Sequence, residues 1–190
     1  MSEFEIVSLL VSPLRRFEGR PADGPAPYDP STGLRTSGDE TVDSAEVRAH
    51  KGLVGDRYFG TRFTFASVTL ISEEAIRELE GTLGAGPFDP VLARRNIVTR
   101  GLDIDALART SFTIDAGHGP IEFRSMTPAN PCAWMNEMYA PGAHAALRGH
   151  GGIRSEPLTS GLLRVGPATI TGVTPIPPEE LRRRIQSAAV

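Results

Sequence analysis

Glycine and proline recur along the whole chain and restrict the folds that are open to it. The 190 residues include 20 glycines and 16 prolines, which separate short apolar runs from one another. Such breaks are unfavourable inside long helices but are common in the turns between strands. The pattern therefore predicts a mainly β, barrel-like domain with small peripheral α-helices.

Several apolar runs have the length and composition of β-strands. Alternation around a glycine-rich turn predicts one hairpin over residues 111–126 and a second over residues 162–176, which turns at Gly166. We expect single strands at residues 4–12, 44–52, 65–72 and 96–99.

Helix-start signals follow some of these runs. Ser72 is a good N-cap, Glu73 and Glu74 suit the first turn, and Gly81 is expected to end that helix. Asp89 followed by Pro90 repeats the start signal. Short helices are also expected over residues 102–109 and 177–186.

Length and composition indicate a single domain over residues 1–190. Hydrophobic residues make up 39% and charged residues 23%, as in ordinary soluble proteins. Residues 19–44 are polar and rich in proline and glycine, which predicts a surface excursion within the domain. The formal net charge of -3 argues against nucleic acid and anionic membranes as partners.

Targeting signals are not apparent, so a cytoplasmic location is expected. Glu3 and Glu5 precede the first apolar run, unlike the basic start of a secretory signal. No apolar window approaches the ~18 residues of a membrane span. The single cysteine excludes an intrachain disulfide and four-thiolate metal sites, and it suits a reducing compartment.

That cysteine, Cys132, lies in the stretch NPCAWMNEM. Pro131 favours a helix start, so we expect Cys132 in the first helical turn, where oriented N–H groups favour the thiolate. A thiolate is both a nucleophile and a soft metal ligand. The alternative is a small buried apolar residue, because free cysteine is often buried.

Three glycine- or arginine-rich stretches offer groups that bind anions. Residues 50–62 combine three glycines with charged side chains, but they lack the order of a phosphate-binding Walker loop. Residues 93–104 place arginines beside an asparagine and a threonine, and residues 149–161 again combine glycines with a cation. The candidate binding residues are Lys51, Asp56, Arg57, Arg62, Arg94, Arg95, Asn96, Thr99, Asn130 and Arg154. Together they predict a site for an anionic, phosphate-bearing ligand near a thiolate.

Five motifs in order give the chain a resemblance to the MOSC domain family, named after the C-terminal domain of molybdenum cofactor sulfurase. They are KGLVGDR, VTLISEEAI, RRNIVTRGLDIDAL, NPCAWM and GHGGIRSEPLTSGLLRVG. The resemblance runs from about Lys51 to Ile170. The resemblance implies a barrel-like β fold and binding of molybdenum cofactor, a pterin dithiolene that ends in a phosphate. It also implies that Cys132 either ligates molybdenum or carries sulfur as a persulfide. Many relatives have a histidine after Gly-Asp-Arg, where this chain has Tyr58.

The resemblance implies two possible activities, and the residues also leave two alternatives open. The resemblance implies either reduction of N-hydroxylated compounds with an electron-donor protein, or sulfur carriage with a sulfur-donor protein. Pyridoxal phosphate is expected only through a separate partner protein. The alternatives are a non-catalytic module that binds a pterin or a small anion, with an incidental cysteine, and a cysteine hydrolase that pairs Cys132 with His118, His144 or His150.

Overall fold

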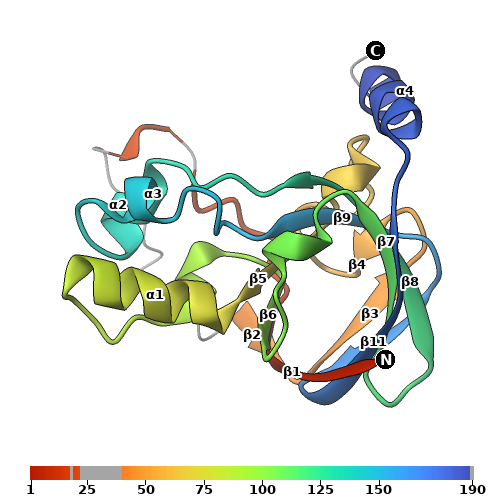
Figure 1. Cartoon of the computed structure of the whole chain (residues 1–190), viewed down its shortest axis with the longest axis horizontal. Coiled ribbons are helices and arrows are strands. Elements are labelled where there is room, and N and C mark those ends of the chain that lie inside the picture. Colours follow the sequence, from red (N-terminus) through yellow and green to blue (C-terminus); the bar gives the residue numbers. More distant parts are fainter. Residues whose placement is uncertain (18, 22–39, 189–190) are drawn as a thin grey trace.

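The computed structural model describes residues 1–17, 19–21 and 40–188. In this part of the chain seven strands close into a barrel (Figure 1). The order around the barrel is β1 (Ser2–Leu10), β11 (Gly166–Pro175), β7 (Thr110–Asp115), β8 (Pro120–Pro128), β9 (Ile153–Pro157), β5 (Val68–Ser72) and β6 (Ile97–Arg100), which pairs again with β1. The predicted mainly β, barrel-like fold is confirmed.

One pair of neighbouring strands in the barrel is parallel. In that pair, β5 and β6, Leu70 lies opposite Ile97, whereas the other pairings around the barrel are antiparallel. Parallel strands need a crossover connection. The crossover here contains α1 (Glu73–Leu83) and the 3₁₀-helix η4 (Pro90–Ala93), so the chain leaves the barrel and returns beside it.

The first predicted hairpin is confirmed, and the second is wrong. Strands β7 and β8 pair directly, with Phe112 opposite Phe123. In contrast, β10 (Gly161–Arg164) pairs with β3 (Ser44–Arg48), while β11 joins the barrel. Gly166, with a φ of 123°, lies where the chain passes from one sheet to the other. Alternation in sequence identifies strands but not their partners, which is why the hairpin prediction failed.

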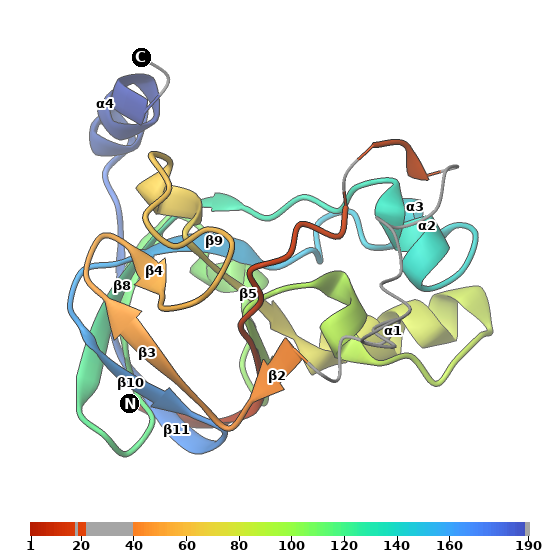
Figure 2. The ribbon, with the colours of Figure 1, turned by 180° about the vertical axis from the view of Figure 1, so that it is seen from behind.

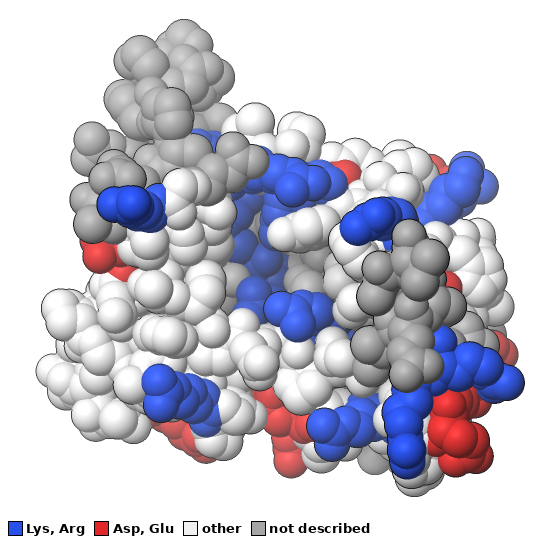
Figure 3. Space-filling view, turned by 90° about the horizontal axis from the view of Figure 1, so that it is seen from above, with Lys and Arg blue, Asp and Glu red and all other residues white. Residues whose placement is uncertain are grey.

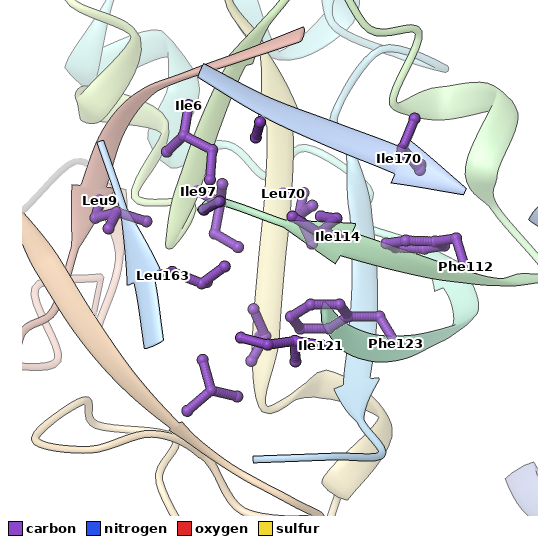
Figure 4. Packing of buried hydrophobic residues seen from close by; sticks show 14 of the residues in the cluster. Ile6, Leu9, Leu70, Ile97, Phe112, Ile114, Ile121, Phe123, Leu163 and Ile170 are labelled. Atoms are coloured by element: carbon purple, nitrogen blue, oxygen red, sulfur yellow. The ribbon is translucent and has the colours of Figure 1, made fainter. Parts of the chain in front are cut away.

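Strand β10, β3 and β4 (Gly52–Leu53) form a second, three-stranded sheet (Figure 2). Its buried side chains join those of the barrel in one core, part of which is drawn in Figure 4. Phe112 and Phe123 stack there with ring centroids 5.8 Å apart, and Leu163 reaches the same cluster from β10. The two sheets therefore share one hydrophobic core.

A layer of short helices packs against one flank of the barrel (Figure 1). It consists of α1, α2 (Trp134–Met138) and α3 (Ala143–Ala146). Ser72 caps α1 by accepting a hydrogen bond from the Ala75 amide at 3.2 Å, as predicted. The predicted end at Gly81 is wrong: α1 continues to Leu83, and the left-handed residue that ends it is Gly84. Gly81 keeps the helical backbone conformation, whereas Gly84 has a φ of 60°.

The remaining predicted elements differ mainly in length. Residues 90–93 and 105–107 (η5, Asp105–Leu107) form single 3₁₀ turns, and residues 64–66 form η3 (Thr64–Ala66) before β5. The terminal helix is present as α4 (Pro178–Ala188), and β9 was not expected at all. Most of the predicted excursion lies outside the described residues, but its end belongs to the fold: β2 (Thr41–Val42) pairs with β1. Among the described helices, none has the length and apolar character needed to span a membrane.

Candidate functional site

A cavity of about 530 Å³ lies between the barrel and the helical layer, because its lining includes Thr69 of β5 and Trp134 of α2. Viewed from above, the molecule has a central hollow in which Lys and Arg side chains gather (Figure 3). Cys132 lines this cavity together with Arg15, Arg16, Arg57, Arg94, Arg95 and Arg154. The other lining residues are Phe17, Tyr58, Ala66, Thr69, Asn130 and Trp134. The protein as a whole is slightly acidic, so this gathering of cations is a local feature.

Cys132 is exposed at the cavity, so the alternative of a buried packing residue is wrong. It lies between β8 and α2, two residues before the helix begins at Trp134. The predicted place in the first helical turn is therefore also wrong. The Cys132 carbonyl accepts a hydrogen bond from the Met135 amide at 2.9 Å, which forms a turn ahead of the helix. Trp134 and Met135 are buried in the helical layer, and their burial holds the end of this turn in place.

Arg94 directs its hydrogen-bond donors mainly at other groups of the protein. Its side chain is buried and forms an ion pair with Glu40, with 2.5 Å between Nη1 and Oε2. It also donates hydrogen bonds to Ser12 and to the Leu14 carbonyl. Burial lowers the pKa of Arg94, although the hydrogen bond to Glu40 opposes this shift. Arg94 therefore joins the segment that follows β1 to the segment that precedes β2.

Arg95 directs its hydrogen-bond donors at backbone carbonyls. Its guanidinium donates to the carbonyls of Gly151, Ala93 and Ala129 at 3.0, 3.2 and 3.1 Å. Burial lowers its pKa to about 10, with the nearby charge of Arg154 acting in the same direction and Cys132 acting against it. At neutral pH the side chain remains a cation beside the thiol.

Three other cavity arginines, Arg15, Arg57 and Arg154, direct fewer hydrogen bonds at the protein than Arg95 does. Arg57 donates to Asp56 at 3.3 Å and to the Arg94 carbonyl at 3.1 Å, and its guanidinium lies 4.8 Å from the ring centroid of Tyr58. Arg15 approaches the same ring at 5.8 Å. Arg154 is half-buried and donates to the Pro128 carbonyl at 3.2 Å. These three side chains retain N–H donors that can reach a ligand.

The predicted loop at residues 50–62 is held close to the barrel by Gly52 and Asp56. Gly52 has a φ of 105°, and a Cβ atom there would lie 2.8 Å from the Ser67 carbonyl oxygen. Asp56 is buried and accepts hydrogen bonds from the amides of Ser12 and Tyr58. Asp56 therefore shapes the loop that places Arg57 and Tyr58 on the cavity, without lining the cavity itself.

The structure brings together only part of the predicted ligand set. Arg57, Arg94, Arg95, Asn130 and Arg154 line the cavity with Cys132, whereas Lys51, Asp56, Arg62, Asn96 and Thr99 do not. Asn96 is fully buried, where it accepts from Thr69 and donates to the Leu10 carbonyl and to Asp56. Thr99 is also buried in β6, and Arg62 lies 4.5 Å from the ring centroid of Phe63.

Sequence reasoning missed several lining residues. Shortly after the first strand come Arg15, Arg16 and Phe17, and two adjacent arginines before an aromatic residue were the available signal. Phe17 stacks on Trp134 with centroids 5.3 Å apart, which places it at the cavity wall. Thr69 carried no signal, because a threonine within a strand is ordinary.

The hydrolase alternative finds no support in the described part of the chain, because no histidine there lines the cavity with Cys132. His118 lies in the turn between β7 and β8, and His144 lies in α3. His150 faces another partner: its Nδ1 atom lies 3.9 Å from Asp105. A base within hydrogen-bond reach of the nucleophile is the first requirement of such a mechanism.

The site thus combines a closed β-barrel, one exposed thiol and a cavity lined by arginines, the side chains that pair best with anionic groups. The sequence model of the MOSC domain matches residues 48–169, and this chain belongs to the MOSC family. The matched range includes the cysteine and four of the six cavity arginines. No curated protein is similar enough in sequence to count as a match.

Solved structures share this fold at low sequence identity. The YuaD protein from Bacillus subtilis is 15% identical with a TM-score of 0.66, over 89% of this chain and 94% of that one. YiiM from Geobacillus stearothermophilus is 17% identical with a TM-score of 0.56, over 89% and 75%. YiiM from Escherichia coli is 12% identical with a TM-score of 0.57, over 90% and 71%. At these identities the likeness shows the fold alone.

Proposed function

We propose that this domain binds molybdenum cofactor in the arginine-lined cavity, with Cys132 directed at the metal. The observation that carries the proposal is that the exposed thiol lines the same cavity as six arginines. The MOSC membership supports it, because the family is associated with this cofactor.

The residues present fit the chemical groups of that cofactor. A soft thiolate from Cys132 would suit molybdenum, and the dithiolene of the cofactor would supply further sulfur. Guanidinium groups bind phosphate oxygens through paired N–H donors. Arg15, Arg57 and Arg154 would hold the phosphate and the polar edge of the pterin, because Arg94 and Arg95 direct most of their donors at the protein. A volume of about 530 Å³ is ordinary for a small-molecule site.

The activity that this site supports best is reduction of N-hydroxylated compounds. The overall reaction takes R–NH–OH, two electrons and two protons to R–NH₂ and water, so the N–O bond breaks. When bound, the cofactor supplies the two-electron redox centre. The protein supplies a thiolate ligand, and its cations offset the charge of phosphate and thiolate. The electrons come from an electron-donor protein that reaches the cavity mouth.

Exposure of Cys132 also favours a second candidate, sulfur carriage. In this reaction the Cys132 thiolate attacks the outer sulfur of a donor protein's persulfide. A new S–S bond forms on Cys132, the S–S bond of the donor breaks, and the donor leaves as a thiolate. This route needs a thiol that another protein can reach, and the exposed position meets that need.

Metal and pterin analysis tests the proposal. The protein is purified anaerobically from a host that makes molybdenum cofactor and from a matched host that cannot. We expect about one molybdenum and one pterin per chain only from the first host, and loss of the molybdenum in Cys132→Ser. A persulfide of Cys132 without pterin, seen by mass spectrometry, would instead establish sulfur carriage. Equal retention of a pterin or anion by wild type and Cys132→Ser, without any activity, would leave a non-catalytic binding module.

A further inference from the structure

One side chain at the cavity connects three stretches that are far apart in the sequence. The Arg95 guanidinium donates to the backbone carbonyls of Ala93, Ala129 and Gly151. These carbonyls belong to the turn before β6, to the segment that carries Cys132, and to the loop before β9. Arg95 thus uses donors from all three of its nitrogens on backbone atoms. An arginine whose only role is to bind a phosphate does not need this arrangement.

The backbone around these carbonyls is packed too closely for side chains. A Cβ atom at Gly151 would lie 2.2 Å from the Ala129 carbonyl oxygen and 3.0 Å from Cδ of Pro131. The Ala129 amide donates to the Gly152 carbonyl at 2.7 Å. The segment that ends in Cys132 therefore packs, backbone to backbone, against the glycine pair formed by Gly151 and Gly152.

The glycine pair is held from its other side as well. The Gly152 amide donates to Asp105 Oδ1 at 3.0 Å, and a Cβ atom at Gly152 would lie 1.9 Å from the Leu70 carbonyl oxygen. Asp105 belongs to η5, outside the cavity that holds the thiol. A continuous set of contacts thus runs from Asp105 through the glycine pair and Arg95 to the residues just before Cys132.

From these contacts we propose that Arg95 is a positioning residue for Cys132, which clamps residues 129–131 against Gly151 and Gly152. This inference rests on the proposed function, since it concerns the placement of the thiol that meets the metal. Lysine keeps the charge, but its three donors lie on one nitrogen and cannot span the three carbonyls that the planar guanidinium reaches. The position of the thiol is then lost even though the cation remains.

Hydrogen–deuterium exchange of the cofactor-free full chain tests the clamp directly. In Arg95→Lys we expect exchange to become about tenfold faster or more in peptides that cover residues 129–135 and 150–153 together. Peptides of the β7–β8 hairpin should keep their wild-type rates. The matched control is Arg154→Lys, which changes another cavity arginine that has a single carbonyl partner, and it should leave residues 150–153 unchanged. Unchanged exchange in Arg95→Lys, or an equal rise in Arg154→Lys, would overturn the proposal.

A second variant covers the case in which Arg95→Lys does not fold. Asp105→Ala removes the acceptor of the Gly152 amide without touching the cavity, and faster exchange is again expected over residues 129–135. Protection that stays at the wild-type level there would contradict the clamp. The readout is independent of the cofactor: absence of molybdenum from the wild type would refute the proposed function and leave the exchange result standing. Full molybdenum loading of a folded Arg95→Lys variant with wild-type exchange would refute only the clamp.

Discussion

Arg94 and Glu40 form an ion pair in which both side chains are about 95% buried, with exposed fractions of 5% and 6%. Glu40 also accepts a hydrogen bond from Ser12, and Arg16 lies 3.6 Å from the same carboxylate. Arg94 adopts a left-handed backbone conformation with a φ of 55°, which its side-chain contacts support. The pair therefore connects the segment before β2 to the cavity wall.

Glu40→Gln should destabilise the fold strongly, because it leaves the buried Arg94 charge without its carboxylate partner. We expect a loss of about 3–5 kcal/mol in the free energy of unfolding at neutral pH, measured by urea denaturation. The control is Glu46→Gln, whose ion pair with Arg48 is exposed and should contribute less than about 1 kcal/mol. Similar losses in the two variants would show that burial of the pair is unimportant.

Acid should weaken the contribution of Glu40 to the free energy of unfolding. Burial alone would raise the pKa of this carboxyl, but hydrogen bonds from Arg94 and Ser12 hold it below its ordinary value of 4.5. A depressed folded-state pKa adds stability above the unfolded value, and that stability disappears as the pH falls through the folded pKa. The difference in unfolding free energy between wild type and Glu40→Gln should therefore be largest near pH 7 and shrink below pH 4.5. A difference that is constant with pH would contradict the ion pair.

Asn96 and Asn130 should respond differently to alanine. Asn96 is buried, and its amide group accepts from Thr69 and donates to two further partners. We expect Asn96→Ala to cost about 2–4 kcal/mol in unfolding free energy. Asn130 is exposed on the cavity, so Asn130→Ala should change stability by less than about 0.5 kcal/mol and lower cofactor retention instead. Normal stability of Asn96→Ala with loss of the cofactor would restore Asn96 as a ligand.

Alanine substitutions at Gly152 and at Gly149 should distinguish the cost of backbone strain from the cost of steric overlap. Both have positive φ, 83° and 87°, but a Cβ atom would meet Leu70 only at Gly152 and has open space at Gly149. Gly149→Ala should cost about 1–2 kcal/mol from the left-handed conformation alone. Gly152→Ala should cost at least about 2 kcal/mol more or prevent folding, as seen in thermal denaturation. Equal melting temperatures would argue against the close packing of the glycine pair.

Arg154 should matter for the ligand rather than for the fold. In the proposed function it holds the anionic part of the cofactor, so Arg154→Gln should lower cofactor retention roughly tenfold or more. Added salt should reduce retention by the wild type more than by this variant. The control is Arg164→Gln on β10, an exposed arginine that does not line the cavity. Retention that falls equally in both variants would point to general charge instead of a specific contact.

Local sequence carried the information for local structure. Ser72 caps a helix because its side chain reaches an amide three residues ahead. A half-buried strand can be recognised because apolar and polar residues alternate along it. The β7–β8 hairpin was predictable for the same reason, since both strands and their turn lie within one short stretch. The order of the motifs also predicted the family, which the family match over residues 48–169 confirms.

Tertiary structure decided which of these residues meet. Glu40 lies 54 positions before Arg94, and Gly151 lies 56 positions after Arg95, so no local pattern could report either contact. Adjacent residues also take opposite roles: Arg95 lines the cavity, whereas Asn96 turns into the protein and satisfies buried backbone groups. The sequence by itself determined most of the strands, the Ser72 helix cap and the presence of one thiol in an arginine-rich chain. Closure of the barrel determined which cations surround the thiol, because contacts between distant segments depend on strand pairing and burial, which a linear pattern does not encode.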